Sequence, residues 1–188
     1  MVAVSPHVNS VVRCFFALMK TLDYNGIDFW SFESVLKRYD FYVQRYKVLS
    51  PSDLKPPIYT EGDTSRVYPI MDKVIECIEK NDLACIEIGV EFIEESCSFP
   101  FGKILKYNTA RALRRASASL TDTQKERIRK RVVEMLCTGY LPREFRQYAK
   151  LARKIGLGDW ESKIEREANL NNSWVNHYYK MIRNNPKD

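Results

Sequence analysis

Residues 120–156 read LTDTQKERIRKRVVEMLCTGYLPREFRQYAKLARKIG and determine most of the fold prediction. In the first half, apolar residues recur at the three- and four-residue spacing of one helix face, and lysine and arginine fill the remaining circumference. The second half repeats the pattern, with an apolar stripe from Phe145 to Ile155. The stretch therefore predicts two amphipathic helices that form a basic hairpin.

The ends of these two helices are marked by capping residues. Thr121 and Gln124 have the spacing of a capping box, in which each side chain bonds a free backbone N–H of the first turn. Gly139 can adopt the left-handed conformation that ends a helix, and Pro142 is tolerated at a first helical position. The second helix is predicted to end at Gly156.

Composition predicts a folded, mostly helical protein. The chain has 188 residues, of which 45% are hydrophobic and 12% aromatic, so it can bury a core. Its five cysteines are an odd number without a CxxC pair, and there are only two histidines, which argues against a metal site or disulfide framework. The cysteines are expected to be mostly buried in a reducing cytosol. The sequence predicts no cofactor.

Hydropathy predicts a cytoplasmic protein that neither crosses a membrane nor is exported. Arg13 interrupts the N-terminal apolar stretch, and no apolar segment reaches the length of a transmembrane helix. The net charge of +6 is divided unequally, because residues 1–100 have a net charge of −5 and residues 101–188 a net charge of +11. This asymmetry points to an anionic partner for the second half.

Three regions are predicted along the chain. Residues 1–49 form an aromatic-rich helical hairpin, with helices over 7–22 and 29–49, the second capped by Asp28. Residues 50–66 contain three prolines and are predicted to be a linker, either an ordered loop or a flexible joint. The aromatic residues of the hairpin are expected to form core, and the alternative is an exposed surface for bases or peptides.

Residues 67–188 are predicted to be a helical body. It contains the basic hairpin and further helices over 67–81, 83–97, 103–119, 159–170 and 171–185. Leu83 and Trp174 are among the residues predicted to face inward. The opposite face of the helix over 83–97 carries Glu87, Glu91, Glu94 and Glu95, which are predicted to be solvated.

An internal repeat is the basis of a family resemblance. A shift of 58 residues superposes the apolar positions of 70–97 on those of 128–155. The segments ECIEKNDLACIEIGVEFIEE and EMLCTGYLPREFRQYAKLARKIG resemble the HEAT and armadillo class of α-solenoids, over about residues 67–168. The resemblance implies a binding surface made of helices, without assigned chemistry. The fold class is thus all-α, with about nine helices in stacked antiparallel hairpins, as a HEAT-like solenoid or an irregular bundle.

The leading functional hypothesis is a non-catalytic module whose basic half binds nucleic acid or an acidic protein surface. If successive helices turn their cations to one side, the cations would form a band that follows a phosphate backbone. The candidate binding residues are Lys103, Lys106, Arg111, Arg114, Arg115, Arg127, Lys130, Arg131, Arg143, Arg146, Lys150 and Arg153.

Two other hypotheses remain open. One is a protein scaffold that self-associates when the acidic residues of 72–95 on one chain contact the basic half of another. The other is a nucleic-acid-processing enzyme on a HEAT-like fold, although the sequence contains no catalytic signature and no candidate catalytic residue.

Overall fold

The computed structural model describes residues 20–96 and 101–184, which are mostly helical, as predicted. The helices are α2 (Phe32–Tyr46), α3 (Ile70–Glu79), α4 (Leu83–Glu94), α5 (Gly102–Arg115), α6 (Asp122–Thr138), α7 (Phe145–Ile155), α8 (Glu161–Glu167) and α9 (Ser173–Arg183). Short 3-10 turns are η1 (Asp28–Trp30), η2 (Ser117–Ser119) and η3 (Gly158–Trp160), and the strands are β1 (Lys20–Asp23), β2 (Ile58–Glu61) and β3 (Thr64–Val67).

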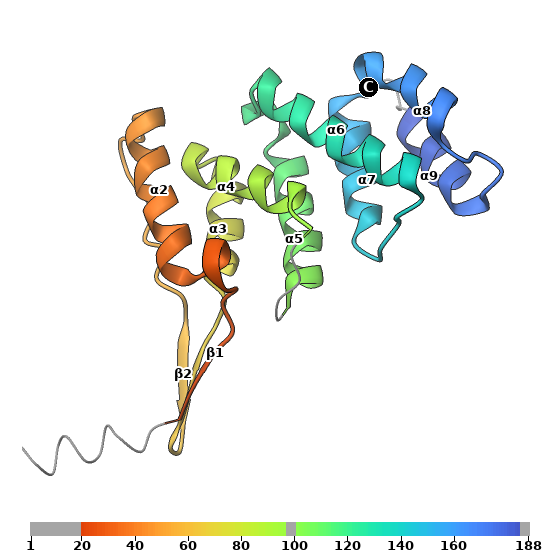
Figure 1. The fold of residues 1–188 in the computed structure, drawn as a ribbon. Coiled ribbons are helices and arrows are strands. Elements are labelled where there is room, and N and C mark those ends of the chain that lie inside the picture. Colours follow the sequence, from red (N-terminus) through yellow and green to blue (C-terminus); the bar gives the residue numbers. More distant parts are fainter. Residues whose placement is uncertain (1–19, 97–100, 185–188) are drawn as a thin grey trace, which may run out of the picture.

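The helices alternate between two layers. In one layer α4 contacts α2 and α6, and α6 also contacts α8; in the other, α5 contacts α3 and α7, and α7 also contacts α9 (Figure 1). Contacts of α4 with α3 and α5, and of α6 with α7, join the layers. α5 and α7 are neighbours in the same layer. Figure 1 shows that they lie side by side and run in the same direction.

The number of residues that separates structurally equivalent helices differs from the 58 residues expected from the sequence. The 58-residue shift superposes α3 on α6, but α3 and α6 belong to different layers, so this shift does not relate structurally equivalent helices. Equivalent helices start 39 residues apart for α4 and α6, at Leu83 and Asp122, and 43 apart for α5 and α7, at Gly102 and Phe145. Amphipathic helices match one another in many registers, which is why the longer shift also aligned apolar positions.

A three-stranded sheet projects from the helices beside α2 (Figure 1). Its strand order is β1-β3-β2, with β1 parallel and β2 antiparallel to β3. The prediction of a helix over 7–22 is therefore wrong for residues 20–22, and its remainder lies outside the described residues. The prediction of a linker over 50–66 missed β2 and most of β3. No residue of these strands is fully buried, so they lack the alternation of buried and exposed side chains that reveals a strand.

Tyrosine side chains of α2 form hydrogen bonds with the acidic face of α4. The hydroxyl groups of Tyr42 and Tyr46 donate hydrogen bonds to Glu91 and Glu87, and burial raises the pKa of Tyr46 to about 12, as does its bond to Glu87. Arg38 forms an ion pair of 2.5 Å with Glu91. The prediction that this face is solvated was therefore wrong for Glu87 and Glu91, because sequence position alone could not show that α2 covers them, whereas Glu95 is exposed as predicted.

Most predicted helix ends and inward positions are confirmed. Thr121 and Gln124 form the capping box of α6, and the Asp82 side chain caps α4. Ser31, rather than Asp28, caps α2. Leu83 and Trp174 were wrongly predicted to face inward, since they are 40% and 65% exposed; both lie in the first turn of a helix. The described cysteines Cys77 and Cys85 are buried as expected, and Cys137 is half-buried.

Candidate anion-binding site

Among the described residues, four of the twelve candidate cations have hydrogen-bond or ion-pair partners inside the protein: Lys106, Arg115, Arg127 and Arg131. Lys106 is buried, and its ammonium group donates a hydrogen bond of 2.5 Å to the Glu95 carbonyl. Arg115 forms an ion pair with Glu79, and Arg127 with both Glu87 and Glu94. Lys106 is therefore too buried for the exposed binding surface that was predicted, whereas Arg115 remains exposed and Arg127 about one third exposed beside their acidic partners. These pairs form because the basic helices meet the acidic hairpin within one chain.

Arg127 is the centre of a polar network between α4 and α6. Its guanidinium group spans the carboxylates of Glu87 and Glu94, while Gln124 donates a further hydrogen bond of 2.6 Å to Glu87. Burial acts to raise the pKa of Glu87, but bonds from Gln124, Arg127 and Tyr46 outweigh burial and hold that pKa below its ordinary value. Glu87 is thus stabilised as a buried carboxylate.

Arg127→Ala is expected to lower the free energy of unfolding at pH 7 by about 2 kcal/mol, since it leaves a buried carboxylate without its cation. We place the loss below that of a fully buried pair because Arg127 is about one third exposed and screened by water. Urea unfolding followed by circular dichroism measures it, with the exposed Lys130→Ala on the same helix as control, expected to change stability by less than about 0.5 kcal/mol.

The lowered pKa of Glu87 determines how the stability loss caused by Arg127→Ala changes with pH. A carboxyl whose pKa is lower in the folded state stabilises the fold above its unfolded pKa of about 4.3, and loses that contribution as the pH falls through the folded value. The penalty of Arg127→Ala should therefore shrink as the pH falls below about 4. An equal penalty at pH 7 and in acid would contradict this network.

Seven candidate cations form what we call the α5–α7 face. At helical spacing Lys103, Arg111 and Arg114 share one side of α5, and Arg146, Lys150 and Arg153 share one side of α7. Among the described residues, none of the seven forms an ion pair, and all are exposed or half-buried. The face consists of Lys103, Arg111, Arg114, Arg143, Arg146, Lys150 and Arg153.

Charge on this face is of one sign along both helices. The α5 sequence GKILKYNTARALRR contains five lysines and arginines, α7 contains four in FRQYAKLARKI, and neither helix contains a carboxylate. Residues three or four apart on a helix lie about 5–6 Å from each other, so Arg146, Lys150 and Arg153 form a continuous row. The remaining two candidates, Lys130 and Arg131, lie on α6, outside this face.

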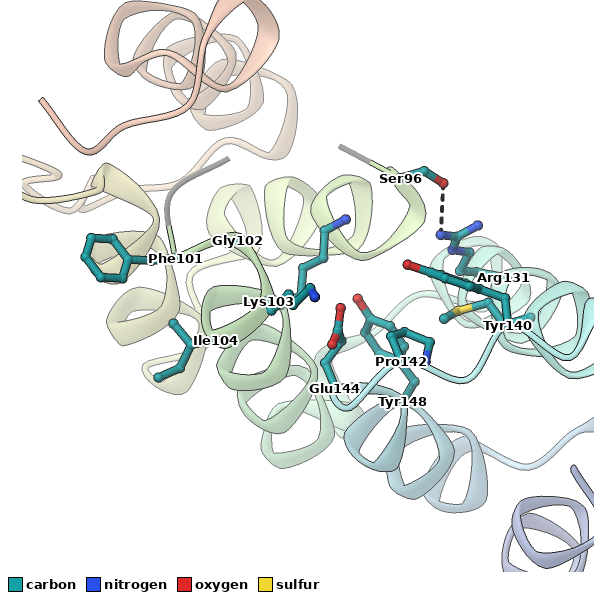
Figure 2. A pocket seen from close by; sticks show the side chains of 12 residues that line it. Ser96, Phe101, Gly102, Lys103, Ile104, Arg131, Tyr140, Pro142, Glu144 and Tyr148 are labelled. Atoms are coloured by element: carbon teal, nitrogen blue, oxygen red, sulfur yellow. Dashed lines mark hydrogen bonds between the residues drawn. The ribbon is translucent and has the colours of Figure 1, made fainter. Parts of the chain in front are cut away.

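A cavity of about 380 Å³, which we call the end pocket, lies at the N-terminal ends of α5 and α7 (Figure 2). A second cavity of about 390 Å³ adjoins it and shares Lys103, Ile104 and Glu144 with it. Arg131 lines the end pocket and donates a hydrogen bond of 3.1 Å to the Ser96 hydroxyl. The polar residues that line the end pocket are Ser96, Lys103, Lys106, Arg131, Tyr140, Glu144 and Tyr148.

The positive ends of two helix dipoles point toward the end pocket. Phe101 precedes α5 in a left-handed conformation (φ 61°), and no side chain caps the first turn of α5. The first turn of α7 also lacks a side-chain hydrogen bond to its backbone. Uncapped N–H groups and the helix dipole attract anions. With Lys103, Arg131 and the nearby Arg143, the site is electrostatically suited to an anionic group.

Sequence reasoning missed Glu144 and Tyr140, which also line this pocket. Glu144 is 6% exposed, and its Oε2 atom accepts no hydrogen bond from the described residues. The single acidic residue in the otherwise basic segment PREFRQYAKLARK was the one available signal. Nothing in the sequence indicated that Tyr140, in the turn before α7, would reach the same cavity.

Comparisons with family models, curated proteins and solved structures found no match to this chain. The HEAT or armadillo resemblance therefore stays a prediction. Within residues 20–96 and 101–184, no helix is long and apolar enough to cross a membrane, and no group of metal-ligating side chains gathers into a site.

Proposed function

We propose that this protein is a non-catalytic helical-repeat module that binds the phosphate backbone of a nucleic acid along the α5–α7 face. The observation that carries the proposal is that α5, α7 and the turn before α7 carry the seven cations of this face, which form no ion pair among the described residues, and that neither helix contains a carboxylate. A cation that forms no ion pair within the protein can bind a phosphate without first breaking such a pair, and the release of counterions from a polyanion on binding is entropically favourable.

Nucleic acid is favoured over an acidic protein surface by the type and spacing of the cations. Five of the seven residues of the face are arginines, whose planar guanidinium groups bind phosphate oxygens in pairs. The continuous rows suit a ligand with charge repeated at regular short intervals. Contacts to phosphates position a strand without reading its sequence, so binding along this face would be weakly sequence-specific.

Self-association through the acidic hairpin is less well supported. The scaffold hypothesis needs the carboxylates of residues 72–95 to be open to a second chain. Glu87 and Glu94 instead pair with Arg127, and Glu91 pairs with Arg38, all within one chain. A second chain would have to break these pairs before it could use the same carboxylates.

Fluorescence anisotropy with a labelled single-stranded oligonucleotide tests the proposal over a range of salt concentrations. For contacts to roughly five phosphates, the logarithm of the affinity should fall against the logarithm of salt with a slope of about −3.5. A duplex of the same sequence and a poly-glutamate of matched charge serve as competitors. Binding without salt dependence would contradict the proposal, and poly-glutamate that competes as well as the oligonucleotide would favour an acidic protein partner.

A further inference from the structure

We propose that the end pocket binds one unpaired guanine of the strand held on the α5–α7 face, with Glu144 accepting hydrogen bonds from the base and Lys103 and Arg131 holding the adjacent phosphate. This inference rests on the proposed function and deepens it, because the face itself carries no means of reading a base. The pocket has the volume of a small-molecule site, which typically lies between about 300 and 1,000 Å³.

Glu144 is the residue that points to a base rather than to phosphate alone. Its side chain is almost completely buried, yet its Oε2 atom has no hydrogen-bond partner among the described residues. Figure 2 shows its carboxylate turned into the space between α5 and the turn before α7. A buried acceptor without a partner costs about 1–3 kcal/mol, so such a group marks a place where a donor is missing. A fully ionised phosphate has no donor to offer, so an anion alone would leave this oxygen without a partner.

Guanine is the base whose edge matches a carboxylate best. Its N1–H and N2–H₂ groups lie side by side and both donate, so the two oxygens of Glu144 can each accept one hydrogen bond. In adenine and cytosine the amino donor stands beside a ring nitrogen that accepts, and in uracil two carbonyl oxygens flank a single N–H. Those edges each place at least one acceptor against the Glu144 carboxylate.

The remaining walls suit the sugar-phosphate and the ring of the same nucleotide. Lys103 and Arg131 line the pocket beside the uncapped first turn of α5, where backbone N–H groups and the helix dipole favour a phosphate. Tyr140 is 58% exposed and lines the pocket, so its ring can stack on the base. Stacking of this kind contributes about 1–3 kcal/mol per base.

Isothermal titration of the full chain with GMP, AMP, CMP, UMP and inorganic phosphate tests the inference. GMP is expected to bind at least about 10-fold more tightly than the other nucleotides and than phosphate, which is the lower range of discrimination by a bidentate contact. A uridine oligonucleotide with one central guanine should likewise bind more tightly than one without. Equal affinity for all nucleotides, or a preference for cytidine, would overturn the assignment of guanine.

Two variants separate recognition from folding. Glu144→Gln keeps the size of the side chain but replaces one acceptor with a donor, so the preference for GMP should fall about 10-fold to near parity. Tyr140→Ala, at an exposed position, should weaken every nucleotide while the order of preference stays. Unchanged GMP preference in Glu144→Gln, with a normal melting curve, would overturn the inference.

The outcomes distinguish this inference from the proposed function. If oligonucleotides bind with a steep salt dependence but without guanine preference, the end pocket assignment fails and the α5–α7 face stands. If GMP binds and oligonucleotides do not, the pocket assignment stands as a mononucleotide site and the proposed function fails.

Discussion

The affinity for a single-stranded oligonucleotide is expected to fall about 100-fold when the four cations on and just before α7 are replaced by glutamine. Each exposed contact to a phosphate contributes about 0.5–1 kcal/mol, so four such contacts account for a change of this size. Loss of four phosphate contacts should also reduce the salt slope by roughly 3. The substitutions are Arg143→Gln, Arg146→Gln, Lys150→Gln and Arg153→Gln.

A control variant removes the same number of positive charges from α8 and α9. Three of the four control cations already pair with Glu161 or Glu167 on the surface of α8 and α9. Their replacement should change affinity by less than about 3-fold, since it alters only long-range charge, which salt screens. Equal losses in the two variants would show that net charge, rather than the α5–α7 face, governs binding. The control substitutions are Lys163→Gln, Arg166→Gln, Lys180→Gln and Arg183→Gln.

Val132→Asp is expected to unfold the helical body. Val132 is 1% exposed on α6, which packs against α4 and α7. A buried charge without a partner costs several kcal/mol, which is comparable with the whole stability of a typical domain of about 5–15 kcal/mol. Thermal unfolding followed by circular dichroism should show a lost or strongly lowered transition at pH 7.

The control for Val132→Asp lies on the same helix. Thr123 is exposed in the first turn of α6, where a carboxylate is favoured by the helix dipole. Thr123→Asp should therefore melt at or slightly above the temperature of the unmodified protein. A normal melting curve for Val132→Asp would mean that the assigned packing of α6 is incorrect.

Local signals made most of the helices predictable, whereas contacts between distant segments were not. The capping box at Thr121 and the cap at Asp82 were found because each depends on residues a few positions apart. The strands were missed because they are short and have no fully buried residue. The burial of Glu87 was missed because it depends on Tyr46, 41 residues earlier, and Arg127, 40 residues later.

The sequence predicted that the candidate site is rich in lysine and arginine, but not which residues form it. The excess of lysine and arginine in the second half was visible in the sequence, but which cations pair internally was not. Arg115 and Arg127 resemble Arg114 and Arg131 in their local sequence, and only the position of Glu79 and Glu87 across the fold separates them. Glu144 was overlooked because a single carboxylate beside many cations normally forms a solvated ion pair.

Photo-crosslinking of a single-stranded oligonucleotide to the full chain, followed by mass spectrometry of the attached peptides, identifies the surface that the nucleic acid contacts. If the α5–α7 face binds the strand, crosslinks are expected on α5 and on the segment from Tyr140 to Arg153, with few on α2, the sheet or α8. Crosslinks concentrated on those other elements, with α5 and α7 unmarked, would contradict binding at this face.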